Sequence, residues 1–355
     1  MTLHIFNPEH DIALASGLSN FTAPHAGRQL RHDLGFLPAI WAKEGDIIMV
    51  DDAEQAAHSW KKLTHRIKSL LGEESLLRAN LEFTPGKPGV YSGQTFRVEP
   101  WGWNIALRDK LIRLGISKID IPSDDYLQMV RKLSHRHTAA TLLPQLRMEG
   151  TIGEMFECQT PEEVEALLTK YGQLVMKAPW SSSGRGLRFL SIGRTPFEQQ
   201  AGWFRNVVKT QGCVMVEPYY NKVKDFGMEF QTDGKGHIEY LGLSLFHTEN
   251  GAYTGNILAT ESIKREMISR YVPIELVDNV REMVISRLDL SDYEGPFGID
   301  MMICAGSLLH PCVEINLRRT MGHVALALTP KDEDLRRVMR IDYTNGNYKL
   351  TINRL

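Results

Sequence analysis

The sequence predicts a mixed α/β (α+β) protein. Short apolar segments alternate with longer segments whose apolar residues recur at helical spacing, and no internal repeat or low-complexity segment interrupts this order. At 355 residues the chain is long enough for two or three domains that each bury a core. We expect an N-terminal α/β domain over residues 1–120, a small unit over residues 121–216 and a third unit over residues 217–355.

The first unit begins with a short strand and continues with further strands and helices. The helix after the second strand should start near Asp52 and stop at Gly72, because apolar residues between them recur at helical spacing. Prolines at 122 and 144 separate the helices that follow. The expected strands are Leu3–Phe6 and Ile47–Val50, and the expected later helices are Asn104–Leu114, Asp124–Leu133 and His135–Leu143.

From Gly150 the pattern changes to closely spaced strands and helices. Thr160 should cap a helix that begins at Pro161, since threonine is a favoured N-cap residue. The remainder of the chain predicts a larger sheet, closed by a strand over Tyr348–Ile352. The elements expected in the small unit are strands Ile152–Cys158, Leu174–Ala178, Leu187–Ser191 and Val214–Val216, and helices Pro161–Tyr171 and Phe197–Lys209.

The composition argues against several classes of partner. A formal net charge of -2, from 41 basic and 43 acidic residues, gives no electrostatic footprint for nucleic acid or an anionic membrane. No segment reaches the ~18 apolar residues of a membrane span. We expect a cytoplasmic protein. Its cysteines lie in apolar runs without CxxC spacing and should be buried, reduced thiols; they are Cys158, Cys213, Cys304 and Cys312.

Acidic residues interrupt two apolar strands between Gly295 and His323. Asp300 lies in the first strand, and Glu314 and Asn316 lie in the second. Residues two apart in a strand face the same side, so Glu314 and Asn316 should project together. A hard cation such as Mg²⁺ prefers oxygen ligands of this kind, and it would offset the cost of burying the carboxylates. The pattern therefore favours a divalent metal site.

A lysine and a glycine-containing loop follow an earlier strand. Lys177 stands at the strand end, and the loop WSSSGRG after it contains Ser183, Gly184 and Gly186. Backbone N–H groups of such a loop can wrap phosphate oxygens, because small residues let the backbone approach closely. The alternative is a solvated hairpin tip, since the loop matches no full phosphate-binding motif.

An acidic segment joins the second and third units. Glu217 and Pro218 end a strand, Tyr220 follows, and Asp225 precedes another alternating strand. An extended segment between two lobes can offer its backbone to an adenine edge, and Asp225 is placed for ribose hydroxyls. A plain connector with a surface aspartate explains the same residues.

The order of these pieces, over residues 133–328, resembles the ATP-grasp superfamily, such as D-alanine:D-alanine ligase and glutathione synthetase. The resemblance implies an N-terminal domain, a lid subdomain and a C-terminal grasp subdomain. It also implies ATP and Mg²⁺ as cofactors, with Mn²⁺ as the alternative cation. In the roles it implies, Lys177 holds the phosphates, Glu217 to Tyr220 hold adenine, Asp225 holds ribose, the metal ligands are Asp300, Glu314 and Asn316, and Arg318 holds the γ-phosphate or an acyl phosphate.

One position departs from the family pattern. Such enzymes usually carry a second phosphate-binding lysine on the helix that enters the lid, where this chain offers Arg136, with Lys132 as the alternative candidate. Arginine keeps the charge and can bind phosphate with two hydrogen bonds. Activity is therefore compatible with the change.

The implied activity is an ATP-dependent carboxylate-amine or carboxylate-thiol ligase that forms ADP. Its partners would be a small-molecule carboxylate and an amine or other nucleophile. A small-molecule kinase and a nucleotide-binding regulatory module without turnover are the alternatives. The oligomeric state stays open, with a homodimer among the alternatives.

Residues outside these motifs are candidates for substrate binding. His10 and Asp11 follow the first strand, where α/β domains usually bind ligands, and Arg28 could complete a carboxylate or phosphate clamp. Tyr253 and Asn256 lie in a loop that could orient an acceptor. Helix capping with surface charges, and a glycine-rich surface turn, are the structural alternatives.

Overall fold

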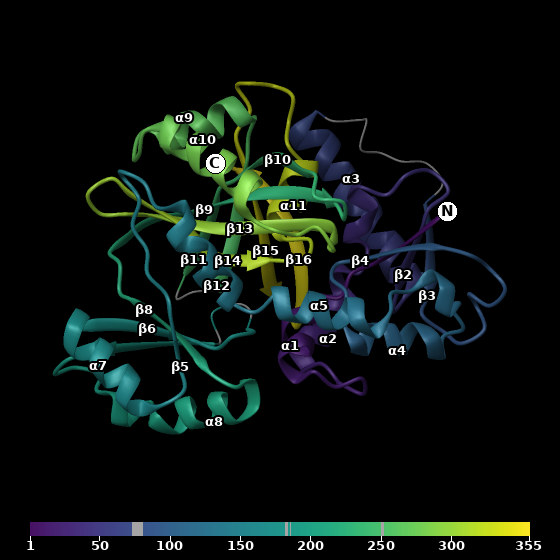
Figure 1. Ribbon diagram of the computed structural model, residues 1–355. Coiled ribbons are helices and arrows are strands. Elements are labelled where there is room, and N and C mark those ends of the chain that lie inside the picture. Colours follow the sequence, from purple (N-terminus) through teal and green to yellow (C-terminus); the bar gives the residue numbers. More distant parts are fainter. Residues whose placement is uncertain (73–80, 182–183, 185, 250–251) are drawn as a thin grey trace.

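Four short parallel strands near the N-terminus form the first sheet (Figure 1). The computed structural model describes residues 1–72, 81–181, 184, 186–249 and 252–355. Buried strands of a parallel sheet read as continuous apolar runs, as the residues IIMV of the second strand do. The sheet order is β3-β2-β1-β4, with strands β1 (Thr2–Ile5), β2 (Ile47–Val50), β3 (Glu82–Pro85) and β4 (Arg97–Pro100).

Helices follow strands β1, β2 and β4 of this region. The helix predicted after Asp52 is confirmed: the Asp52 side chain accepts a hydrogen bond from the Gln55 N–H at 3.0 Å, and Gly72 ends the helix with a φ of +66°. The helices are α1 (His10–Ser16), α2 (His25–Leu34), α3 (Ala53–Leu71) and α4 (Ile105–Arg113), with 3-10 turns at Leu37–Ile40 and Lys118–Asp120.

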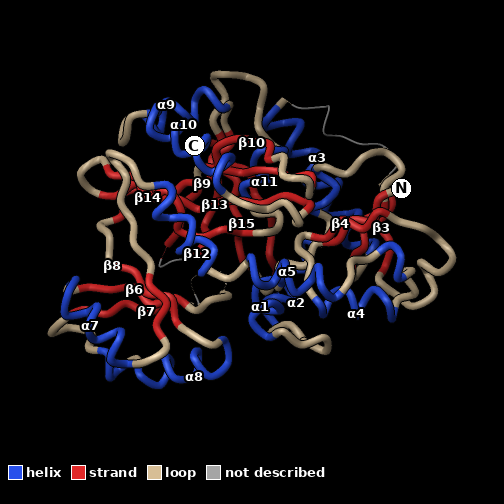
Figure 2. The backbone as a smooth tube through the Cα atoms, in the orientation of Figure 1, coloured by secondary structure: helices blue, strands red, loops and turns tan. Residues whose placement is uncertain are grey.

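A separate antiparallel sheet, which we call the lid sheet, follows a helical connection (Figure 2). The connection contains α5 (Asp124–Leu133), α6 (His137–Leu142) and a 3-10 turn at Leu143–Leu146. Thr160 caps α7 in a capping box with Glu163, as its sequence predicted. The lid sheet has the order β5-β8-β6-β7 and contains β5 (Phe156–Cys158), β6 (Gln173–Lys177), β7 (Leu187–Ser191), β8 (Val214–Pro218), α7 (Pro161–Tyr171) and α8 (Ala201–Gln211).

Two local predictions for this region were wrong. The strand expected from Ile152 begins only at Phe156, because the Ile152 N–H donates to Leu309 of a different sheet at 2.9 Å. The helix expected over Phe197–Lys209 is split into a 3-10 turn at Phe197–Gln199 and α8. Helical periodicity alone does not distinguish these two kinds of turn.

Two further antiparallel sheets form the C-terminal part. The sheet that we call the grasp sheet has the order β10-β9-β13-β14, and the other has the order β11-β12-β15-β16. The strands are β9 (Lys222–Asp233), β10 (Ile238–Ser244), β11 (Phe246–Glu249), β12 (Ala252–Leu258), β13 (Glu294–Cys304), β14 (Leu308–Asn316), β15 (Arg337–Thr344) and β16 (Asn347–Arg354), and the helices are α9 (Glu261–Ser269), α10 (Ile274–Arg287) and α11 (Met321–Ala327).

One hydrophobic core joins the two ends of the chain. Trp60 of α3 and Trp101, which follows β4, belong to the same buried cluster as Val324 of α11 and Ile352 of β16. The ring of Phe6 packs edge-on against Trp101 at 5.0 Å. The N-terminal helices are therefore fixed against the C-terminal sheets, while the proposed limits of the three units stay a prediction.

The structure bears on two expectations from the sequence, the burial of the cysteines and the absence of a membrane-spanning segment. All four cysteines are buried and free, as predicted. Among the residues that the structure describes, no helix combines the length and apolar character needed to cross a membrane.

Candidate active site

Lys177 lies at the end of β6, where the sequence placed it, and it pairs with a carboxylate that was expected to act elsewhere. Its Nζ is 2.6 Å from Oε1 of Glu217, and both residues are almost fully buried. Glu217 lies diagonally across the ladder from Lys177, because Val175 is the residue directly opposite it. Glu217 therefore compensates the charge of Lys177, and its side chain is not free for an adenine edge.

The loop after Lys177 requires glycine at two positions. Gly184 has a φ of +69°, and a Cβ on Gly186 would lie 2.3 Å from the Ser181 hydroxyl. The Ala178 N–H donates to the Gly186 carbonyl at 2.8 Å and holds the loop beside β6. Ser183 lies outside the described residues.

The predicted metal ligands come together on the grasp sheet. Asp300 of β13 is the cross-strand partner of Glu314 on β14, and Asn316 donates to Asp300 at 3.2 Å. Burial, together with the nearby carboxylates of Glu314 and Glu229, raises the pKa of Asp300 to about 8.

A divalent cation held by Asp300, Glu314 and Asn316 would relieve the repulsion between the two carboxylates. Among the residues that the structure describes, no three His, Cys, Asp or Glu side chains are grouped so that they could hold a metal ion without other ligands. Two carboxylates and an amide suit Mg²⁺, which keeps water and phosphate oxygens as its other ligands.

Arg136 links the lid sheet to the grasp sheet. It is 5% exposed, and it donates to the carbonyl of Ala178, to the Ser181 hydroxyl at 3.0 Å and to Glu314 at 2.7 Å. The cation predicted to replace a phosphate-binding lysine thus lies between the loop after Lys177 and a predicted metal ligand. Lys132, the alternative candidate, lines a neighbouring groove instead.

Arg318 forms a two-pronged ion pair with Asp11. Its Nε and Nη2 each donate to an Asp11 carboxylate oxygen at 2.8 Å, and Nη2 also donates to Asn316 at 2.8 Å. Burial opposes the charge of Arg318, but Asp11 raises its pKa above the usual value. The N-terminal helix α1 thereby contributes a side chain to the same site as β14.

The segment after β8 differs in detail from its prediction. Asp225 lies inside β9 rather than before it, and it accepts from Lys222 at 2.6 Å and from Thr248. Pro218 is the last residue of β8, and the Tyr220 hydroxyl accepts from the Glu154 N–H at 2.8 Å. Within the described part of the chain the Tyr220 N–H has no hydrogen-bond acceptor, so it remains available to a ligand.

The structure separates the predicted clamp of His10, Asp11 and Arg28. His10 is buried and its Nδ1 is 3.2 Å from the Asn104 amide nitrogen, whereas Asp11 is held by Arg318. Burial lowers the pKa of His10 to about 4. Arg28 lines a different cavity, formed by α2 and α4.

Tyr253 and Asn256 lie on β12 and bond to each other. The Tyr253 hydroxyl donates to Asn256, and the fully buried Asn256 amide donates to Ser244 at 2.8 Å. Both polar groups therefore have partners within the protein. Their role in orienting a substrate stays a prediction.

Two residues of this region were missed by the sequence analysis. His310 lies on β14 four residues before Glu314, and a register shift in the β13–β14 ladder lies between them, so the strand period gave no signal for it. Trp180 follows the Lys177 strand, and its indole N–H donates to the Arg131 carbonyl at 3.0 Å. The Arg131 guanidinium lies 4.1 Å from the Trp180 ring.

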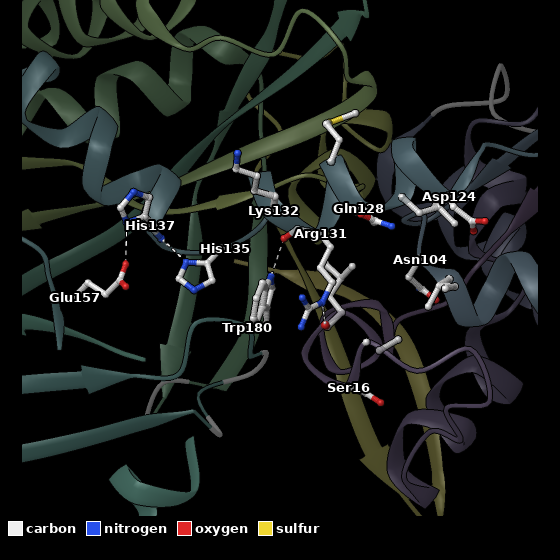
Figure 3. Close-up of a pocket in the computed structure, with 16 residues that line it drawn as sticks. Ser16, Asn104, Asp124, Gln128, Arg131, Lys132, His135, His137, Glu157 and Trp180 are labelled. Atoms are coloured by element: carbon white, nitrogen blue, oxygen red, sulfur yellow. Dashed lines mark hydrogen bonds and ion pairs between the residues drawn. The ribbon is translucent and has the colours of Figure 1, made fainter. Parts of the chain in front are cut away.

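A cavity and a groove adjoin these residues. The cavity between Asp11, Trp180, Ser181 and Glu314 has a volume of about 10 Å³, enough for about one water molecule. Leu14 and Trp180 line both this cavity and a groove of about 920 Å³ (Figure 3). The groove lies between α1, α5 and the lid sheet, and its polar lining includes Ser16, Asn104, Gln128, His135, His137 and Glu157.

The likeness of this chain to known proteins lies in its structure and not in its sequence. No protein-family model and no curated protein sequence matches the chain. The structure is similar to N5-carboxyaminoimidazole synthetase from Staphylococcus aureus complexed with ADP, at 12% identity and a TM-score of 0.52, over 97% of this chain and 83% of that chain. It is also similar to biotin carboxylase from Campylobacter jejuni in its β-γ-ATP complex, at 12% identity and a TM-score of 0.53, over 98% of this chain and 77% of that chain. Both are ATP-grasp enzymes, and this chain has the ATP-grasp fold that its motifs predicted.

Proposed function

We propose that this protein is an ATP- and Mg²⁺-dependent, ADP-forming ligase, which activates a small-molecule carboxylate as an acyl phosphate for attack by an amine or another nucleophile. The observation that carries the proposal is the contact between Arg136 and Glu314, which joins the loop after Lys177 to the paired carboxylates of β13 and β14. Cations suited to phosphoryl oxygens and ligands suited to a metal are thereby placed in one site.

Nucleotide binding would use groups from both sheets. Lys177 has three N–H donors and uses one of them on Glu217, so the others can donate to phosphate oxygens while the contact with Glu217 is kept. The free N–H of Tyr220 can donate to an adenine ring nitrogen. Asp300, Glu314 and Asn316 would hold Mg²⁺, which supplies neutralisation of charge on the phosphoryl oxygens.

The reaction requires charge stabilisation and positioning rather than a protein nucleophile. A carboxylate oxygen of the substrate forms a bond to the γ-phosphorus, and the bond from that phosphorus to ADP breaks. The nucleophile then attacks the acyl carbon, and inorganic phosphate leaves. Arg318 and Arg136 would stabilise the charge that spreads over the transferred oxygens.

The narrow cavity between the lid sheet and β14 has a consequence for this sequence of steps. The cavity of about 10 Å³ is too small for a phosphoryl group, so we propose that the lid sheet moves away from β14 when the γ-phosphate reaches Glu314. Return of the lid would exclude water from the acyl phosphate, which water would otherwise hydrolyse.

A screen for ATP-dependent phosphate release across carboxylic acids and amines tests the proposed function. Glu314→Ala and the conservative Glu314→Gln should each lower turnover about a hundredfold or more, because each removes a metal-binding carboxylate. Glu239→Ala, at an exposed position of β10, is the matched control and should keep wild-type turnover. Undiminished turnover in a folded Glu314→Ala protein would contradict the proposed metal site.

The product separates ligation from a kinase reaction. Hydroxylamine traps an acyl phosphate as a hydroxamate, and we expect hydroxamate to accumulate when the nucleophile is left out. A phosphorylated product that is stable to hydroxylamine would instead assign a kinase.

A paired substitution tests the nucleotide site without leaving a lone buried charge. Lys177→Met combined with Glu217→Gln removes both charges of the ion pair. The affinity for MgATP, measured by calorimetric titration, should fall about tenfold or more. Lys209→Met, on the exposed end of α8, is the control.

A further inference from the structure

A second polar cavity lies on the N-terminal side of α1, away from the paired carboxylates of the grasp sheet. It has a volume of about 190 Å³ and is bordered by the end of β1 at Ile5 and by α4 along its length, from Ala106 to Arg113. In the order β3-β2-β1-β4 the chain leaves β1 toward β2 on one side and returns to β4 on the other. The crevice at the carboxyl ends of β1 and β4 is therefore the switch point at which open α/β sheets bind ligands.

Two helices direct basic side chains toward this cavity. Arg28 and Arg31 are three residues apart on α2, and Lys110 and Arg113 are three residues apart on α4, so each pair occupies one helix face. The two helices pack on opposite faces of the N-terminal sheet, α2 on the face of Ile48 and Val50 and α4 on the face of Leu3 and Ile5, so the cavity lies between them at the strand ends.

The charges in this cavity are not balanced by the protein. Arg31 is paired with Glu9 and with Asp51, the latter at 3.2 Å. Across the described ranges 1–72, 81–181, 184, 186–249 and 252–355, the side chains of Arg28, Lys110 and Arg113 have no ion pair or hydrogen bond. The four cations and two carboxylates leave a net charge of +2.

The positive charges around this cavity repel one another. Burial, together with the nearby charge of Arg31, lowers the pKa of Lys110. Like charges held together around a cavity destabilise the free protein, and an anion in the cavity would remove that repulsion.

We propose that this cavity binds the phosphate or carboxylate group of a small-molecule substrate, through Arg28, Lys110 and Arg113. Ala13 and Asn104 line both this cavity and the 920 Å³ groove, and the groove borders the Asp11 cavity through Leu14. An elongated substrate anchored here by one anionic end would lie along α1, with its other end at Asp11 and Arg318. The role of that other end rests on the proposed ligase function, whereas anion binding itself does not.

Calorimetric titration with inorganic phosphate and, separately, with malonate tests the proposal at constant ionic strength. The double variant Lys110→Gln, Arg113→Gln should bind the preferred anion about tenfold or more weakly than the wild type. The preferred anion identifies the ligand group as phosphate or carboxylate. Equal affinity in the double variant, or no binding of either anion to the wild type, would overturn the proposal.

A matched control separates local recognition from the general loss of two positive charges. Arg194→Gln with Lys209→Gln makes the same change in net charge at exposed positions of the lid region, and it should keep wild-type anion affinity. The site variant should also unfold at the same temperature as the wild type or a higher one, because it removes repulsion rather than packing. A large drop in that temperature would show that Lys110 and Arg113 stabilise the fold, and would overturn their assignment as binding residues.

MgATP titrations of the same samples distinguish failure of this proposal from failure of the ligase proposal. MgATP affinity should be equal in the wild type and the site variant. If the wild type binds phosphate but not MgATP, the ligase proposal fails and the anion cavity stands. If it binds MgATP but neither anion, the anion cavity fails and the ligase proposal stands.

Discussion

His310 should make the stability of this protein depend on pH in a way that a single substitution removes. Its side chain is fully buried, and neither ring nitrogen has a hydrogen-bond partner in the described part of the structure. The Tyr220 ring lies 5.4 Å away, and a Cβ on Gly153 would lie 2.8 Å from the imidazole. No acceptor is therefore placed to stabilise a protonated ring.

The expected magnitude follows from the displaced pKa. Burial, with the nearby Lys177 charge, lowers the pKa of His310 from 6.5 to about 3. Below pH 6.5 the unfolded chain binds a proton at this residue and the native protein does not, so native stability falls as the pH is lowered from 6.5 toward 3. Each pH unit costs about 1.4 kcal/mol, which gives about 2.7 kcal/mol between pH 6.5 and pH 4.5.

Urea unfolding at pH 7.5 and pH 4.5 measures this effect. His310→Gln carries no titrating group, and any packing cost of the variant is the same at both pH values. The wild type should therefore lose about 2.7 kcal/mol more than the variant on acidification. His65→Gln, at an exposed position of α3, should behave as the wild type. Parallel losses in the wild type and His310→Gln would refute the reasoning.

Three further experiments test other contacts by urea unfolding. A double-mutant cycle with Asp11→Asn and Arg318→Met should give a coupling of about 4 kcal/mol, the Coulomb energy of charges ~4 Å apart at an effective dielectric of ~20; a coupling near zero would contradict the ion pair. Gly322→Ala would place a Cβ 1.8 Å from the buried Glu229 carboxylate, so it should destabilise the protein by about 1–3 kcal/mol. The control Gly202→Ala in α8, where nothing lies within 4 Å of the new Cβ, should not destabilise it. Equal effects of the two substitutions would exclude the steric cause. Asp278→Asn should lower the free energy of unfolding by about 1 kcal/mol at pH 7, because two 2.7 Å hydrogen bonds from Arg265 lower the Asp278 pKa. This loss of stability should disappear as the pH falls below 3.8 through the folded-state pKa. A loss that persists there would rule out ionisation as its source.

Local patterns predicted the parts of the structure whose causes are local. The helix α5 and the capped helices α3 and α7 match their predicted bounds because a cap and a periodic face lie within one stretch of chain. The meeting of Asp300 with Glu314 was also predictable, since two successive antiparallel strands bring those positions together.

Contacts between residues far apart in the sequence could not be predicted from local patterns. The contact between Glu217 and Lys177 was not predicted, because the sequence around Glu217 does not reveal the register that places the two side chains together. The same holds for the cavity of α2 and α4, where the sequence singled out Arg28 but gave no reason to join it with Lys110 and Arg113. Such sets of residues depend on how helices from separate segments pack.

The ion pair between Asp11 and Arg318 also bears on the order in which the molecule is assembled. Its members are separated by 307 residues, and closing so long a loop costs entropy that earlier contacts must offset. We expect the pair to form late in folding, so that substitutions there speed unfolding while leaving the folding rate almost unchanged. On the ribosome, the first helix would emerge well before its partner is synthesised. The site would therefore be completed only when nearly the whole chain has been made.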